Sequence, residues 1–156
     1  MEKIKKLKNT FTNKKIDGYI IPKNDEFFGE YIPDHKDRLK YISNFTGSYG
    51  FALILKNKNY LFVDGRYTLQ ANKQSSNFFK IKTIPDETPN EILKNKKLKI
   101  GFDPSLFTKI NLNFFFGKTD CKFIPIRTNL IDKIWKRKKD KVRKKFYTLP
   151  QTALYE

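Results

Sequence analysis

Apolar residues recur with a helical period at the start of the chain. Ile4, Leu7 and Phe11 are three and four positions apart within a basic segment, which predicts an amphipathic helix over residues 2–14. After a break at an Asp-Gly pair, the short apolar run 19–22 predicts a buried strand that ends at a proline. The chain is therefore expected to open with a helix followed by a strand.

Two neighbouring apolar runs predict a hairpin. Residues 51–55 and 60–63 both have the length and composition of strands, and the polar residues 56–59 between them form a connection of hairpin length. A short helix is predicted before the hairpin, over residues 35–43. Asp64, directly after the hairpin, is placed to cap the first turn of another helix.

The rest of the chain alternates between the two periods. Strands are predicted at 78–84, 98–103 and 122–126, and helices at 88–93 and 106–116. Strands that alternate with helices are typical of a layered α/β domain. A chain of 156 residues is long enough to bury one core, so one domain is expected.

The composition changes after Trp135. Residues 136–145 are almost all charged and mostly basic, as in a linker or tail. We therefore predict a folded domain over residues 1–135 and a basic linker or tail over residues 136–156.

The formal net charge of +17 points first to a polyanion such as nucleic acid. Of the 33 basic residues, however, 28 are lysines, and a bias toward AT-rich codons can supply lysine without any partner. Proteins that bind phosphates favour the planar fork of arginine, which is scarce here. The composition therefore does not favour nucleic-acid binding as the main function, and a basic polyanion- or nucleic-acid-binding module is kept as the alternative.

The single cysteine, Cys121, excludes an internal disulfide framework. The basic N-terminus lacks an apolar run of signal-peptide length, and no window approaches the roughly 20 apolar residues of a membrane span. A cytoplasmic protein without a membrane partner is expected.

Residues for independent catalysis are scarce. One histidine, His35, and one cysteine cannot supply the three or four ligands of a zinc site, and His35 reads as an exposed residue at a helix start. Nucleophile-elbow, phosphate-loop and HExxH motifs are absent. We predict no catalytic and no metal-binding residues, while an independent enzyme with a carboxylate metal site stays open for Asp17, Asp25, Glu30, Asp64 and Asp103.

Arg66 has two interpretations. It follows a predicted strand end, where functional sites of α/β sheets gather, and it also stands two positions after Asp64, where a structural salt bridge would form. The residues alone leave both open.

Two strings of the chain are specific motifs: Asp-Gly-Arg-Tyr-Thr-Leu-Gln-Ala at 64–71 and Asn-Leu-Ile-Asp-Lys-Ile-Trp at 129–135. Further segments accompany them at residues 17–25, 30–33, 41–50 and 100–104. Taken in order, these segments resemble the N-terminal domain of Xaa-Pro aminopeptidases (aminopeptidase P), in the creatinase/prolidase N-terminal domain family.

The resemblance implies a fold and a division of labour. The fold is a mixed β-sheet flanked by helices with a ribonuclease-H-like topology. In this family catalysis lies in a later "pita-bread" domain, where two divalent ions of the manganese type activate water to cut before a penultimate proline. The chain would then be a non-catalytic domain with no cofactor of its own. Its partners would be the catalytic domain, peptides with proline in second position, and further copies of itself in a homo-oligomer. It would shape substrate access and oligomer contacts.

The resemblance also assigns residues. Arg66 matches the arginine through which the family's N-terminal domain contributes to peptide binding. A histidine often found before the Glu-Tyr-Ile string is Phe27 here, so its role does not carry over. Two apolar groups are open to core packing or to docking on a partner: Phe114 to Phe116, and Leu130, Ile131, Ile134 and Trp135.

Overall fold

The computed structural model describes residues 2–29 and 31–137 and contains one six-stranded sheet. Its order is β4-β3-β2-β1-β5-β6, and only β2 runs antiparallel to its neighbours. The predicted α/β fold with a mixed sheet is confirmed, including the β2–β3 hairpin. The strands are β1 (Gly18–Pro22), β2 (Phe51–Leu55), β3 (Asn59–Asp64), β4 (Lys80–Ile84), β5 (Lys99–Phe102) and β6 (Lys122–Pro125).

Six α-helices connect or flank these strands within the described residues. They are α1 (Glu2–Lys14), α2 (Arg38–Ser43), α3 (Thr68–Ser75), α4 (Pro89–Leu93), α5 (Lys109–Phe116) and α6 (Leu130–Ile134). The predicted helix over 35–43 is interrupted, because the Asp37 side chain accepts a hydrogen bond from the Lys40 backbone N–H at 2.9 Å and starts α2 there. A separate 3₁₀ turn, Asp34–Lys36, precedes it.

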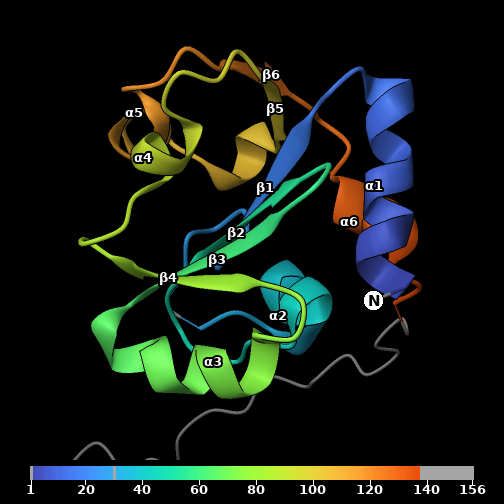
Figure 1. Cartoon of the computed structure of the whole chain (residues 1–156). Coiled ribbons are helices and arrows are strands. Elements are labelled where there is room, and N and C mark those ends of the chain that lie inside the picture. Colours follow the sequence, from blue (N-terminus) through green and yellow to red (C-terminus); the bar gives the residue numbers. More distant parts are fainter. Residues whose placement is uncertain (1, 30, 138–156) are drawn as a thin grey trace, which may run out of the picture.

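The sheet separates two apolar layers (Figure 1). Successive side chains of a strand point to opposite faces, so Tyr19 and Ile21 of β1 pack toward α1, α2, α3 and α6, whereas Ile20 packs toward α4 and α5. All five residues of β2 are buried, which explains why its sequence is continuously apolar rather than alternating. The result is a sheet covered on both faces.

Helix α1 buries the stripe that its sequence predicts. Ile4, Leu7 and Phe11 have exposed fractions of 7%, 0% and 1%, and they lie in the same core layer as α6. In Figure 1 the two helices run beside each other. Leu130 and Ile131 of α6 are fully buried, so these two residues serve core packing.

The two remaining apolar groups divide between core and surface. The Trp135 ring is partly buried and stacks on Tyr41 with 4.6 Å between ring centroids, so it closes the α1, α2, α6 layer. In α5, Phe116 is buried at 1% exposure, but Phe114 on the outer side is 73% exposed. The sequence could not separate these phenylalanines because they are consecutive and the apolar residues of the helix do not form a single stripe.

The strand directions give the sheet two chemically different edges. Strands β1, β3, β4, β5 and β6 all run the same way, so their last residues meet at one edge, which we call the carboxyl edge, and their first residues meet at the opposite, amino edge. Ligand sites in open α/β sheets gather outside the carboxyl ends of strands.

No helix within residues 2–29 and 31–137 has the length and apolar character to cross a bilayer.

Gly50 at this edge has no room for a side chain. Its φ is +153°, and an added Cβ would lie 2.6 Å from the backbone oxygen of Phe62. We expect Gly50→Ala to lower the free energy of unfolding by about 1–3 kcal/mol through this strain. Gly65→Ala is the matched control, because a Cβ there meets nothing within 4 Å. Equal urea midpoints for both variants would contradict the expected strain.

Candidate functional site

Asp64 holds the side chain of Arg66 at the carboxyl edge. Asp64 ends β3, and its Oδ1 accepts hydrogen bonds from the backbone N–H of Arg66 at 3.0 Å and from Arg66 Nε at 3.2 Å. Its Oδ2 accepts a third from Arg66 Nη2 at 2.7 Å. The predicted salt bridge is therefore confirmed. Instead of starting an α-helix directly, Asp64 caps a 3₁₀ turn, Gly65–Tyr67, and α3 follows.

This ion pair presents the guanidinium to solvent. The Arg66 side chain is 75% exposed, while the Asp64 side chain is only 23% exposed. Arg66 Nη1 bonds to no residue in the described part of the chain, so it faces outward with donors to spare. A carboxylate behind an exposed guanidinium fixes its direction and leaves part of its fork available to a ligand.

The pair is charged at neutral pH. The side-chain hydrogen bond from Arg66 is the largest effect and lowers the pKa of Asp64 below its ordinary value of 3.8. Burial opposes it, while the backbone hydrogen bond and the charge of Arg66 lower the pKa further. Because the folded-state pKa is depressed, the stabilisation from this carboxylate is present above pH 3.8 and is lost as the pH falls below that value.

The loop before β2 forms a common rim with the Arg66 turn. The Ser48 and Tyr67 hydroxyls are 2.7 Å apart, and the Phe45 and Tyr67 rings meet edge to face at 6.0 Å between centroids. Tyr49 is 41% exposed, and burial together with the negative charge of Asp64 raises the pKa of its hydroxyl. This rim unites β3, its following turn and the loop before β2.

An aromatic hollow of about 330 Å³ continues along the edge from Tyr49. It lies between the end of β1, the start of β2 and α5, and its walls include Tyr49, Phe51, Phe107, Phe114 and Phe115. Lys23, which pairs with Asp37, also lines it. The edge thus combines the exposed Arg66 cation with a recess that has both aromatic and polar walls, an arrangement suited to a peptide.

The four candidate carboxylates within the described residues do not converge. Asp17 bonds Lys56 at 2.6 Å, Asp25 accepts from the Phe27 backbone N–H at 3.0 Å, and Asp64 holds Arg66. Asp103 accepts from the Ser105 hydroxyl at 2.6 Å and from Asn129, while Glu30 lies outside the described residues. Across residues 2–29 and 31–137, no three His, Cys, Asp or Glu side chains gather as metal ligands would. Each described carboxylate serves a cap, a turn or an ion pair.

Two further predicted positions lie in the connection between β1 and α2. His35 is exposed within the 3₁₀ turn, as its sequence context indicates. The Phe27 ring is 77% exposed, and the Lys36 ammonium lies 4.3 Å from its centroid. Neither residue contributes to the Arg66 rim.

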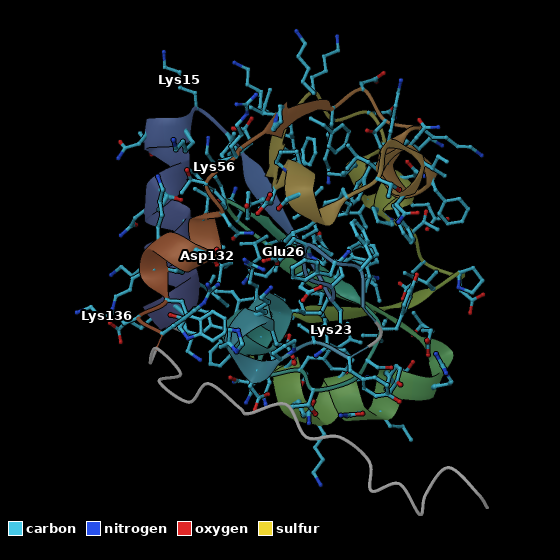
Figure 2. The ribbon with its side chains drawn as sticks, turned by 180° about the vertical axis from the view of Figure 1, so that it is seen from behind. Lys15, Lys23, Glu26, Lys56, Asp132 and Lys136 are labelled. Carbon is cyan, nitrogen blue, oxygen red and sulfur yellow. The ribbon has the colours of Figure 1, made fainter. Side chains whose placement is uncertain are left out.

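Sequence reasoning missed a partly buried ion pair between α2 and α6, in which the Asp132 side chain is 29% exposed. Arg38 Nε and Nη2 donate to the two carboxylate oxygens of Asp132 at 2.8 and 2.9 Å, a bidentate pair between α2 and α6. The Arg38 side chain is 8% exposed. Figure 2 labels Asp132 and Glu26. The Glu26 Oε2 atom lies 3.9 Å from Arg38 Nη1, so a second carboxylate approaches the guanidinium. The sequence shows an arginine at position 38, but it does not indicate that Asp132, 94 positions later, is its partner.

Comparisons with known proteins agree with this architecture. Residues 3–134 match the family described as the Creatinase/Prolidase N-terminal domain. The probable Xaa-Pro aminopeptidase P of Coprinopsis cinerea is 33% identical over 138 residues, which cover 83% of this chain and 22% of that protein. The chain spans about a quarter or less of the length of the curated relatives it matches.

Solved structures show the same fold. The X-prolyl aminopeptidase of Caenorhabditis elegans, described as a cytosolic enzyme with a di-nuclear active site, is 31% identical with a TM-score of 0.77 over 86% of this chain and 25% of that one. The N-terminal domain of the cytoplasmic peptidase PepQ from Mycobacterium tuberculosis shares the fold at 19% identity and a TM-score of 0.65, with coverage of 86% and 98%. The polyanion-binding alternative gains no support from these relatives.

Proposed function

Because the chain belongs to the creatinase/prolidase N-terminal domain family, we propose that it is the non-catalytic N-terminal domain of an Xaa-Pro aminopeptidase. Such a metallopeptidase releases an N-terminal residue that is linked to proline. Residues 1–135 form the domain in this proposal, and the basic residues 136–156 lead toward a catalytic domain. The names of the relatives and the fraction of their length that the chain spans support this assignment.

The observation that carries the proposal is the exposed Arg66 guanidinium held by Asp64 at the carboxyl edge. A planar guanidinium makes forked hydrogen bonds to a carboxylate or a peptide carbonyl. Since Asp64 already orients the group, little side-chain freedom is lost when a peptide binds. Arg66 is thus proposed to bind the peptide substrate, and it has no chemical step to perform by itself.

The two metal ions belong elsewhere in this proposal. The C. elegans relative is described as di-nuclear, and a di-nuclear centre requires several carboxylate or histidine ligands within one site. The part of the chain that the structure describes lacks such a cluster and does not fit that centre. Two divalent ions of the manganese type are therefore assigned to the catalytic domain, and this chain takes no cofactor.

The hollow beside Arg66 suits a role in substrate access. Its aromatic walls and the exposed Tyr49 would contact the peptide chain beyond the scissile bond. The outer face of α5, where Ile110 and Phe114 are 80% and 73% exposed, is proposed for contacts within a homo-oligomer. A cytosolic location is proposed from the description of the C. elegans relative.

A reconstitution experiment tests the proposal. The chain is mixed with a separately produced catalytic domain of an Xaa-Pro aminopeptidase, with manganese and a peptide that has proline in second position. We expect kcat/KM to rise severalfold over the catalytic domain alone, because the N-terminal domain completes the peptide site. An unchanged kcat/KM, despite association of the two polypeptides in gel filtration, would refute the proposed role.

A further inference from the structure

Exposed lysines gather at the amino edge of the sheet, opposite Arg66. Five turns lie at this edge, each after the end of α1 or before the start of a strand: residues 14–17, 56–58, 76–80, 94–99 and 118–122. Together they hold eleven lysines, all exposed, and two aspartates, Asp17 and Asp120. Figure 2 shows two of the lysines, Lys15 and Lys56, at one end of the molecule. The charge comes from turns far apart in sequence, so only the fold assembles it.

Backbone hydrogen bonds confirm that these turns are neighbours. The backbone N–H of Lys56 donates to the Asp17 carbonyl at 3.1 Å, and the Asp17 N–H donates to the Lys99 carbonyl at 2.7 Å. The Lys122 N–H donates to the Leu98 carbonyl at 2.8 Å. The lysines in the turns 14–17, 56–58, 94–99 and 118–122 therefore lie on one connected basic surface.

The protein supplies little negative charge to balance this surface. Asp17 is already held by Lys56 Nζ at 2.6 Å and by the Lys99 backbone N–H at 3.0 Å. Among the described residues, no carboxylate lies within ion-pair distance of Lys58, Lys97 or Lys122. By contrast, Asp25, Glu26, Asp34, Asp37 and Asp64 all follow the carboxyl ends of strands. The fold is therefore polarised, with a basic amino edge whose eleven lysines outnumber its two aspartates.

An apolar hollow of about 290 Å³ opens within the basic surface. Leu55, Tyr60 and Leu98 contribute its apolar walls, and Lys56, Lys58 and Lys96 surround it. The hollow gives the surface a specificity that charge alone does not provide, because it accepts an apolar side chain between the lysines.

We propose that the amino edge binds an acidic polypeptide segment that inserts one apolar side chain into this hollow. Asp17 shows the mode of carboxylate binding, since its oxygens take one lysine ammonium and one backbone N–H. The proposal concerns the edge opposite Arg66 and is independent of the proposed peptidase role.

Charge and chemistry distinguish this occupant from others. None of the five turns contains an arginine, the residue that phosphate readers favour, and an apolar hollow offers nothing to a phosphate. The chain's own residues 136–145 carry the same sign of charge as the amino edge, as does the amino edge of a second copy. An acidic segment of another protein complements both the charge and the hollow.

The test uses a labelled synthetic peptide of Glu and Asp with one central Leu, titrated with the full chain at low ionic strength and followed by fluorescence anisotropy. Lys58→Glu combined with Lys97→Glu is expected to weaken binding about tenfold. The matched control, Lys73→Glu with Lys133→Glu, makes the same change in net charge at exposed lysines of α3 and α6 and is expected to change the affinity less than about twofold. Circular dichroism verifies that all variants are folded.

Three results would overturn the proposal. Absence of peptide binding would refute the proposal directly. Equal losses of affinity in the two double variants would leave only a general effect of net charge. Unchanged affinity after Leu→Gln substitution in the peptide would remove the hollow from the site. Tighter binding of a single-stranded oligonucleotide of matched charge, lost in the Lys58/Lys97 variant, would identify nucleic acid as the occupant instead.

Discussion

Asp132→Ala is expected to lower the free energy of unfolding by about 3 kcal/mol. The substitution leaves the Arg38 guanidinium, 8% exposed, without the carboxylate that takes two of its hydrogen bonds. Arg38 Nη1 already lacks a hydrogen-bond partner, so the charge would be compensated only through the longer contact with the Glu26 carboxylate at 3.9 Å. Urea denaturation followed by Trp135 fluorescence measures the loss.

Two further variants make this expectation specific. Asp34→Ala removes a carboxylate that is 89% exposed and bound to Lys40, and it is expected to leave the urea midpoint nearly unchanged. Arg38→Met combined with Asp132→Leu removes both charges and is expected to recover much of the stability. A loss below about 1 kcal/mol for Asp132→Ala itself would mean that solvent, rather than the protein, stabilises Arg38.

Arg66→Ala is expected to have the largest effect on function. In the reconstituted enzyme it should lower kcat/KM for a peptide with proline in second position by about tenfold to one-hundredfold, the equivalent of losing one charge-assisted hydrogen bond. The domain should remain folded with nearly unchanged stability, because the Arg66 side chain is 75% exposed. Steady-state kinetics of the mixture supply the measurement.

Arg66→Lys is the informative control. Lysine keeps the positive charge but lacks the planar fork, so an intermediate loss is expected if the fork contacts the peptide. Identical kcat/KM for the unmodified chain and Arg66→Ala, with the domain still required for activity, would remove Arg66 from the peptide site.

Local sequence patterns predicted much of the fold because many elements carry their own signal. The stripe of Ile4, Leu7 and Phe11 fixes α1 and its buried face, and the paired apolar runs fix the β2–β3 hairpin. The Asp64–Arg66 pair was also predictable, since its partners are two residues apart and share one turn. The family resemblance supplied the strand arrangement, which periodicity does not encode.

Long-range pairing lay beyond the sequence. Arg38 and Asp132 are 94 positions apart, and both appeared as ordinary surface charges. Likewise, the hollow between Tyr49 and Phe114 depends on how α5 packs beside β2. The amino-edge lysines were visible only as net charge, because their common surface arises from the sheet topology.

Helix capping explains the smaller differences between the predicted and the observed first residues of two helices. Asp37 accepts the Lys40 N–H and therefore starts α2 later than the apolar pattern indicates. Thr108 does the same for α5, where its hydroxyl accepts the Asn111 N–H at 3.1 Å and the preceding residues form a 3₁₀ turn. A hydrophobic period locates a helix, whereas the competing side-chain acceptors set its first residue.

The most direct test of the account compares peptide turnover by the chain alone, by a catalytic domain alone and by both together, with manganese present. The account predicts no turnover by the chain, and a higher kcat/KM for the mixture than for the catalytic domain. Turnover that copurifies with the chain through successive columns would contradict it, because residues of this domain would then carry out the hydrolysis themselves.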